Sequence, residues 1–368
     1  MISRQQIAIK SSMALKFAQS QVRKLIETHP DVYPEFTVDG QWSPNVNPWT
    51  SWCEGFLPGM MWIFHQYSGD PWWREQAECY SKPLEPRKHD RNVHDLGFIF
   101  WSTYKRWYDL TGDAHLNDVL IEAGKTMSLR FNPKGKFLRS FLAEDSLFID
   151  IMMNVGIIFY AAQQTGSQEL FDIATEHCLT TRKYLVRGDG STSHEGIFDL
   201  DTGEFLRQTT QQGWRDDSSW ARGTAWALYG FGTVYGFTQD ARFLQTARLI
   251  ADFYIERTPP NGVPSNDWDD PASKYPYESS AAAIAASGML NLAKLVQDPA
   301  AALGYRQYAY QILDTLTSPD FLAQGTPGYE GILKHGIYHL NKGMGVDESV
   351  MWGEYFFVEA LSKVLHGE

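Results

Sequence analysis

The sequence predicts an all-α fold, an (α/α)6 barrel in which inner and outer helices alternate along the chain. Three features of the 368 residues indicate this fold: a turn that recurs four times, six long stretches that are apolar nearly all round, and six amphipathic stretches between them. No linker or low-complexity tract divides the sequence, so we expect one domain over residues 1–368. Two separate helical domains are the main structural alternative.

The recurring turns are typical of helical hairpins. Each follows an apolar stretch and precedes an amphipathic one, as expected where one helix ends at a glycine or polar turn and the next begins. The four turns are HQYSGD (65–70), YDLTGD (108–113), QQTGS (163–167) and YGFTQD (235–240).

The apolar stretches are predicted to be the inner helices, because helices that are apolar all round are packed on every side. They cover residues 51–67, 94–110, 146–164, 218–237, 279–296 and 349–365. The amphipathic stretches are predicted to be the outer helices, each with one buried face. They cover about 4–28, 71–80, 114–129, 168–186, 241–257 and 298–317. Strand signals are weak and local, and the clearest predicts a short hairpin around 196–206.

The composition excludes several classes of partner. A net charge of −12 argues against binding to nucleic acid or to an anionic membrane, since both need a basic surface. The sequence has no apolar run of about 18 residues and its start does not resemble a signal peptide, so we expect a cytoplasmic protein. The three cysteines are scattered, which favours free thiols over a disulfide framework or a metal site.

The starts of the inner helices are expected to meet at one mouth of the ring. Backbone N–H groups and positive dipole ends then point into one cavity, which can hold an anion within an acidic protein. Acidic residues gather at these starts, and we expect most of them to cap helices. The acids are Glu54, Asp95, Asp145, Asp150, Asp216, Asp217, Glu278, Asp347 and Glu348.

Two of these acids fit a catalytic role better than a cap. Asp150 is expected one turn inside its inner helix, between apolar neighbours, where desolvation raises the pKa of a carboxyl. A raised pKa suits a general acid near neutral pH. Asp95 follows His94 at the start of the preceding inner helix and is expected at the same mouth. Its like charge there raises the pKa of Asp150 further.

Aromatic residues make up 14% of the chain, which is typical either of sugar-stacking surfaces or of an aromatic core. Arg222 lies between Trp220 and Trp226 and is a candidate for two-pronged binding of a carboxylate. The alternative is a structural ion pair with Asp216 or Asp217. His335 and His339 have the i, i+4 spacing of metal ligands, but Gly336 follows directly and no metal is expected.

Six motifs run through nearly the whole chain: WCEGFLPG (52–59), HDLGFIF (94–100), FIDIMMN (148–154), QGWRDDSSWARGTAW (212–226), SSAAAIAASGML (279–290) and GVDESVMWGEYFFVEAL (345–361). On these residues the chain resembles the unsaturated glucuronyl hydrolases of glycoside hydrolase family 88. The resemblance implies that Asp150 is the catalytic acid/base and Asp95 the second essential carboxylate. It also implies a sugar subsite lined by Trp52, His94, His194, Gln212, Trp220, Arg222 and Trp226. Trp49 is an alternative to Trp52 for stacking.

The chemistry implied by the resemblance is hydration of a C4=C5 double bond in a terminal unsaturated glucuronic acid, with no metal or organic cofactor. The substrate is then a lyase-generated di- or oligosaccharide. An unsaturated rhamnogalacturonyl hydrolase is the close alternative, and a sugar 2-epimerase or a non-catalytic binder of acidic sugars are the distant ones. Lys342, which a sulfate on the second sugar would suit, is interpreted as a solvated loop residue. The sequence does not predict the oligomeric state.

Overall fold

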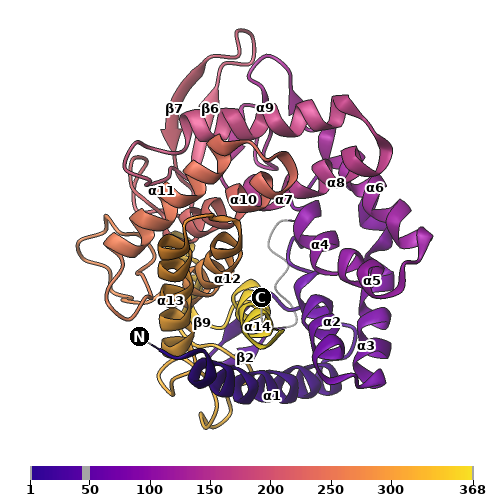
Figure 1. The fold of residues 1–368 in the computed structure, drawn as a ribbon, viewed down its shortest axis with the longest axis vertical. Helices are drawn as coiled ribbons and strands as arrows, with labels where there is room; N and C mark the ends of the chain where they lie inside the picture. Colours follow the sequence, from indigo (N-terminus) through magenta and orange to yellow (C-terminus); the bar gives the residue numbers. More distant parts are fainter. Residues whose placement is uncertain (1, 44–49, 367–368) are drawn as a thin grey trace.

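Helices arranged as a closed ring make up most of the structure, a computed structural model that describes residues 2–43 and 50–366 (Figure 1). The prediction of a mainly helical chain is therefore confirmed. Within the described ranges, no helix is both long enough and apolar enough to cross a membrane.

The inner helices line the centre of the ring, and each contacts the next until α14 meets α2 and closes the circle. The short pairs α4–α5 and α7–α8 each occupy one inner position, since Thr103 and Val155 interrupt the helix. The inner helices are α2 (Phe56–Ser68), α4 (Leu96–Ser102), α5 (Tyr104–Thr111), α7 (Ile151–Asn154), α8 (Gly156–Thr165), α10 (Ala221–Thr238), α12 (Ser279–Leu295) and α14 (Met351–His366).

The outer helices pack against the inner ones with one face only. In α6, Leu116, Val119, Leu120 and Ala123 are buried, as their spacing predicts. A 3-10 helix, η1 (Lys82–His89), continues α3, and a second, η2 (Leu340–Lys342), lies in the last long loop. The outer helices are α1 (Arg4–Thr28), α3 (Pro71–Ser81), α6 (Ala114–Ser128), α9 (Gln168–Tyr184), α11 (Ala241–Arg257) and α13 (Pro299–Leu316).

The recurring turns join inner to outer helices. Gly69 and Gly112 end α2 and α5 in the left-handed conformation, with φ of 70° and 68°, which glycine adopts without strain. Asp70 and Asp113 follow at once, and each carboxylate accepts a backbone N–H from the first turn of the next helix. One short sequence thus ends one helix and starts the next.

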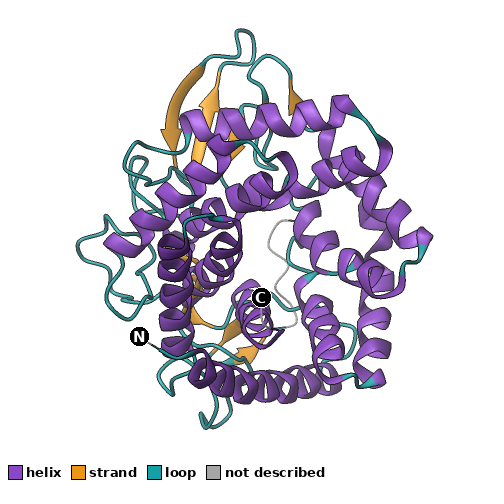
Figure 2. Ribbon diagram, in the orientation of Figure 1, coloured by secondary structure: helices purple, strands orange, loops and turns teal. Residues whose placement is uncertain are grey.

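Short strands lie in the loops between helices (Figure 2). Three of them form an antiparallel sheet in the order β5 (Ser146–Phe148), β6 (Glu195–Phe198) and β7 (Phe205–Thr209). The predicted hairpin around 196–206 is confirmed as β6–β7. The others are the antiparallel pairs β1 (Thr37–Val38) with β2 (Gln41–Trp42), β3 (Phe131–Asn132) with β4 (Phe137–Leu138), and β8 (Gly336–His339) with β9 (Met344–Glu348).

The predicted start of the third inner helix is wrong. Residues 146–148 pair with β6, so the helix begins only at Ile151 and Asp150 stands immediately before it, not one turn inside. The side chain of Asp150 nevertheless makes no capping hydrogen bond. Strand pairing with a segment almost 50 residues away overrides the local apolar pattern here.

Glu278 is the acid that caps an inner helix as predicted, by accepting the N–H groups of Ser280 and Ala281 at the start of α12. Other acids of that group bond elsewhere, so the capping prediction is wrong for them. Glu54 pairs with Arg87, and Asp347 pairs with His335.

Candidate active site

The starts of the inner helices and the loops before them surround a cavity. Its empty volume, with the open solvent at its mouth included, is about 680 Å³. Six of the predicted site residues line its wall, and they are Trp52, His94, Asp95, Asp150, Gln212 and Arg222. Residues from four distant parts of the chain therefore meet at this end of the ring.

Asp150 lies in this wall at the point where β5 gives way to α7. Its side chain is 15% exposed, and burial raises the pKa of Asp150 to about 6. The like charge of Asp95 raises that pKa further, whereas His94 and Arg222 lower it. The structure therefore agrees with the desolvated carboxyl that the sequence predicts, although the backbone around it differs.

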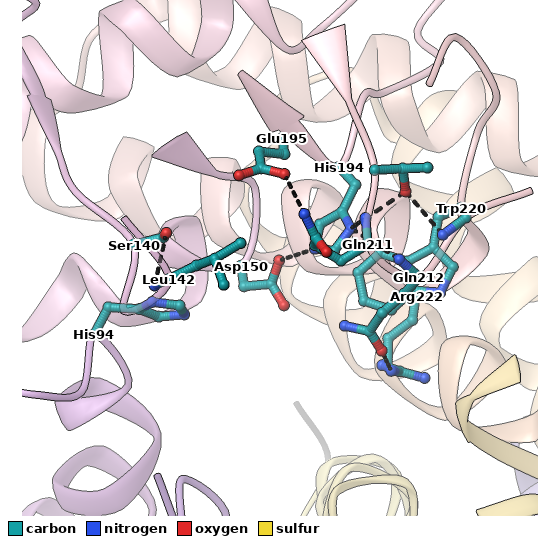
Figure 3. Close-up of polar contacts among 12 residues, drawn as sticks. His94, Ser140, Leu142, Asp150, His194, Glu195, Gln211, Gln212, Trp220 and Arg222 are labelled. Carbon is teal, nitrogen blue, oxygen red and sulfur yellow. Dashed lines mark hydrogen bonds and ion pairs between the residues drawn. The ribbon is translucent and has the colours of Figure 1, made fainter. Parts of the chain in front are cut away.

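His194 faces Asp150 with a defined tautomer (Figure 3). Its Nδ1 accepts the backbone N–H of Gln211 at 3.1 Å, so the proton of the neutral ring is on Nε2. That nitrogen lies 3.6 Å from Asp150 Oδ2. Burial lowers the pKa of His194 well below its usual value, and the nearby Arg222 lowers it further. His194 is thus a neutral N–H donor aimed at the carboxylate from behind the cavity wall.

His94 repeats this arrangement at the second carboxylate. Its Nδ1 accepts the N–H of Phe141 at 2.9 Å, which leaves Nε2–H directed at Asp95 Oδ1, 3.3 Å away. Asn154 also donates to Asp95 Oδ1, at 3.2 Å, while its own carbonyl accepts the N–H of Phe98. Both carboxylates therefore face histidines whose tautomers are set by backbone N–H groups.

Arg222 is buried at the cavity wall, and its hydrogen bonds to the described residues are structural. Its guanidinium donates to the carbonyl oxygens of Ile337 and Tyr338 and, at 2.5 Å, to the side-chain oxygen of Gln212. The nearest carboxylate is that of Glu278, at 4.0 Å. The alternative of an ion pair with Asp216 or Asp217 is wrong, because Asp217 pairs with Arg215 and Asp216 accepts from Thr209.

The tryptophans of the predicted subsite occupy different depths. Trp52 lines the cavity, and its indole N–H donates to the Tyr338 hydroxyl at 2.9 Å. Trp220 lies one layer behind, with its ring 4.5 Å from the Arg222 guanidinium and 4.6 Å from the His194 ring. Trp226 does not line the cavity: it packs against Phe98 and Phe356 in the core. Trp49 lies outside the described residues.

Several residues of the cavity were not predicted from the sequence. Lys342 lines it and is exposed, so the structure agrees with the interpretation of this lysine as a solvated loop residue. His339 also lines it, whereas His335 bonds to Asp347, and the described residues contain no cluster of three or more metal-binding side chains. The other unpredicted lining residues are Thr50, Phe141, Leu142, Phe148, Gln211 and Tyr338. Gln211, next to Gln212, and Phe148, the first residue of FIDIMMN, carried a local signal.

Comparison with known proteins identifies the family. A model described as Glycosyl Hydrolase Family 88 matches residues 18–291. The chain belongs to glycosyl hydrolase family 88. The resemblance inferred from the motifs and the prediction of a glycoside hydrolase are therefore confirmed.

This family 88 chain is similar to proteins named unsaturated glucuronyl hydrolase and unsaturated chondroitin disaccharide hydrolase. It is 33% identical over 325 residues to an unsaturated glucuronyl hydrolase of Formosa agariphila, covering 86% of the chain and 80% of that protein. It is 30% identical over 324 residues to an unsaturated chondroitin disaccharide hydrolase of Streptococcus pneumoniae, covering 85% and 81%. A crystal structure of an unsaturated glucuronyl hydrolase specific for heparin has a TM-score of 0.90 at 30% identity and covers 97% of both chains.

Proposed function

We propose that this protein removes the terminal unsaturated glucuronic acid from lyase-generated oligosaccharides by hydrating the C4=C5 double bond, with Asp150 as the acid and base. The observation that carries the proposal is the Asp150 carboxyl, which lines the cavity and whose pKa burial raises to about 6. A group with that pKa both gives and takes a proton near neutral pH. The names of the relatives support the same reaction.

The reaction needs one proton and one water molecule. Asp150 protonates C4, and the resulting carboxylate takes a proton from the water that adds at C5. The hemiketal formed at C5 collapses, the sugar ring opens, and the neighbouring sugar leaves at C1 to yield a keto acid. Asp95 acts in this scheme mainly through its charge, which favours the protonated form of Asp150 before the reaction starts.

The substrate carboxylate is placed by electrostatic attraction. The Arg222 guanidinium is buried at the cavity wall, with its donors already bonded to two backbone carbonyls and to Gln212. Its charge therefore acts as a fixed field, and the amide NH2 of Gln212, whose oxygen Arg222 holds, is the group that contacts the sugar. Trp52 supplies an apolar face for the ring.

The architecture in this proposal is a single (α/α)6-barrel catalytic domain. The circle of contacts from α2 through α14 and back to α2 supports it, as does the placement of the cavity at the starts of the inner helices. The cytoplasmic location expected from the sequence stays a prediction, as does the absence of nucleic-acid and membrane partners.

The epimerase alternative is disfavoured by His94 and His194, the two histidines that face the carboxylates. A 2-epimerase needs an unprotonated nitrogen facing the substrate carbon to take a proton. In His94 and His194 that nitrogen is Nδ1, and in each ring it already accepts a backbone N–H. The nitrogens directed at the carboxylates carry protons, so these histidines are donors and not bases.

The test follows the ultraviolet absorbance of the conjugated double bond over time. The panel is unsaturated disaccharides from chondroitin, hyaluronan, heparin, gellan and rhamnogalacturonan, and the control is Asp150→Asn. We expect absorbance to fall with the wild-type protein and not with the variant, and the fastest substrate identifies the second sugar. Faster loss with rhamnogalacturonan would instead show the rhamnogalacturonyl activity. No loss with any member of the panel would refute the proposed function.

A further inference from the structure

Glu195 is a buried carboxyl behind the cavity wall, 1% exposed, and the proposed reaction does not use it. It lies at the start of β6, next to His194 in the chain. Its two oxygens contact Ser146 on β5 and Gln211 in the loop that follows β7. Figure 3 shows Glu195 pointing at Gln211, and both Gln211 and Asp150 line the cavity. The carboxyl therefore connects the small sheet to the site.

A chain of hydrogen bonds runs through two serines toward Glu195. The N–H of Leu142 donates to Ser140 Oγ at 3.2 Å, and Ser140 Oγ donates to Ser146 Oγ at 2.8 Å. Ser146 Oγ then donates to Glu195 Oε1. Each hydroxyl has one proton, and both protons in this chain point toward the carboxyl. Glu195 Oε1 is therefore an acceptor.

The second oxygen of Glu195 sets the orientation of Gln211. Gln211 Nε2 donates to Glu195 Oε2 at 2.9 Å. Burial raises the pKa of Glu195, whereas the hydrogen bonds from Ser146 and Gln211 lower it. In its ionised form the carboxylate has no proton to donate, so the reverse orientation of the amide would place two acceptors against each other. Gln211 thus uses its NH2 group on Glu195, and its carbonyl oxygen is the end left for the cavity that Gln211 lines.

The neighbouring glutamine is held the opposite way round. Arg222 Nη2 donates to Gln212 Oε1 at 2.5 Å, so the carbonyl of Gln212 is occupied and its NH2 group is left for the cavity. Two successive side chains of the same type therefore present unlike groups, an acceptor from Gln211 and a donor from Gln212. A carboxylate imposes the first orientation and a guanidinium the second.

We propose that Glu195 is a positioning residue that holds Gln211 as a hydrogen-bond acceptor for the bound sugar. Gln211 and Gln212 then recognise a substrate that offers a donor beside an acceptor. A hydroxyl or the N–H of an acetamido group supplies the donor, and a hydroxyl or carboxylate oxygen supplies the acceptor. This inference rests on the proposed function, since the sugar in question is the substrate of that reaction.

The experiment is a double-mutant cycle with Glu195→Gln and Gln211→Met, read as kcat and KM on the best disaccharide. Glu195→Gln keeps the size of the side chain but allows the Gln211 amide to turn over. Loss of a hydrogen bond to a substrate costs about tenfold or more in affinity. We expect each single variant to raise KM about tenfold with little change in kcat, and the double variant to match either single one, because Glu195 acts only through Gln211.

Two results would overturn the inference while leaving the proposed function intact: an unchanged KM in Glu195→Gln, or effects of the two substitutions that multiply. Should Glu195→Gln not fold, Ser146→Ala replaces it in the cycle, with the same expectation of non-additivity. This substitution removes the hydroxyl that donates to Glu195 and accepts from Ser140. If the wild-type protein consumes no unsaturated disaccharide, the proposed function fails by itself. The cycle is then read as dissociation constants for saturated glucuronate, with the same two outcomes overturning the inference.

Discussion

His194 Nε2 lies 3.6 Å from Asp150 Oδ2, and both atoms are buried without a hydrogen-bond partner among the described residues. An unsatisfied buried donor and acceptor are costly, and such a pair is typical of a site that tightens around its substrate. The Nε2 proton is fixed there because Nδ1 accepts a backbone N–H. The Nε2–H of His194 is therefore positioned to donate a hydrogen bond to Asp150 when that carboxyl is ionised.

Asp150→Asn is expected to lower kcat by about a thousandfold or more, within the range that general acid–base catalysis contributes. The amide keeps the shape of the side chain but cannot donate and recover the proton. Turnover is measured by loss of ultraviolet absorbance, and circular dichroism checks that the fold is retained. Activity within tenfold of the wild type would contradict the role of Asp150.

The pH dependence of kcat/KM follows from the protonation state that Asp150 must have before the reaction starts. Its carboxyl must be protonated to act on C4, and its pKa is about 6, so kcat/KM is expected to fall as pH rises through about 6. Asp95→Asn removes the like charge that raises this pKa. The residual activity of Asp95→Asn is therefore expected to fall at a lower pH than the activity of the wild type. If the activity of the variant falls at the same pH as that of the wild type, Asp95 does not act on Asp150 through its charge.

Arg222→Lys is expected to raise KM by about tenfold or more and to change kcat less. Lysine keeps the positive charge but lacks the planar fork that bonds two carbonyls and Gln212, so the Gln212 amide is released. Saturation kinetics with the preferred disaccharide measure both constants. Unchanged KM would mean that the charge alone places the substrate.

Stability is expected to depend on pH through Glu354 on α14. Burial raises the pKa of Glu354 from 4.5 to about 8, although its carboxyl accepts the N–H groups of Ile332 and Leu333. The stability that the protonated group contributes is fully present below pH 4.5 and is lost as pH rises through about 8. Glu354→Gln stays neutral, so Tm measured from pH 5 to 8 is expected to fall less than in the wild type.

Glu359 on the same helix provides the matched control. Lys363 and Arg106 lower its pKa to about 2, against the effect of burial, so its contribution is present above pH 4.5 and lost only as pH falls toward 2. Glu359→Gln is therefore expected to lower Tm overall but to leave the slope between pH 5 and 8 unchanged. A flattened slope in Glu359→Gln as well would assign the pH dependence to another group.

Most helices could be predicted from sequence because their causes are local. Turns such as YSGD carry both a left-handed glycine and the capping aspartate of the next helix, so both helix ends are set within four residues. The start at Ile151 could not be predicted in this way. Residues 146–148 are apolar enough for a helix, and only pairing with β6 makes them a strand.

The same distinction between local and long-range causes applies to the residues of the candidate site. Asp150, Asp95, Trp52, His94, Gln212 and Arg222 were predicted from motifs, and the structure brings them to one cavity. Trp226 belongs to a motif too, but its ring is directed into the core. The contribution of Tyr338 could not be predicted, because it reaches the cavity from the segment between α13 and α14, far away in sequence.

Local pattern alone was enough to define the helical class, the repeated hairpins, the acidic character and the motifs of the family, since each depends on neighbours within a few turns. Closure of the ring decided the rest: which residues share the cavity, how far Asp150 is desolvated, and which way Gln211 and Gln212 are turned. Desolvation and hydrogen-bond direction depend on atoms that come from distant segments, and only packing brings those atoms together.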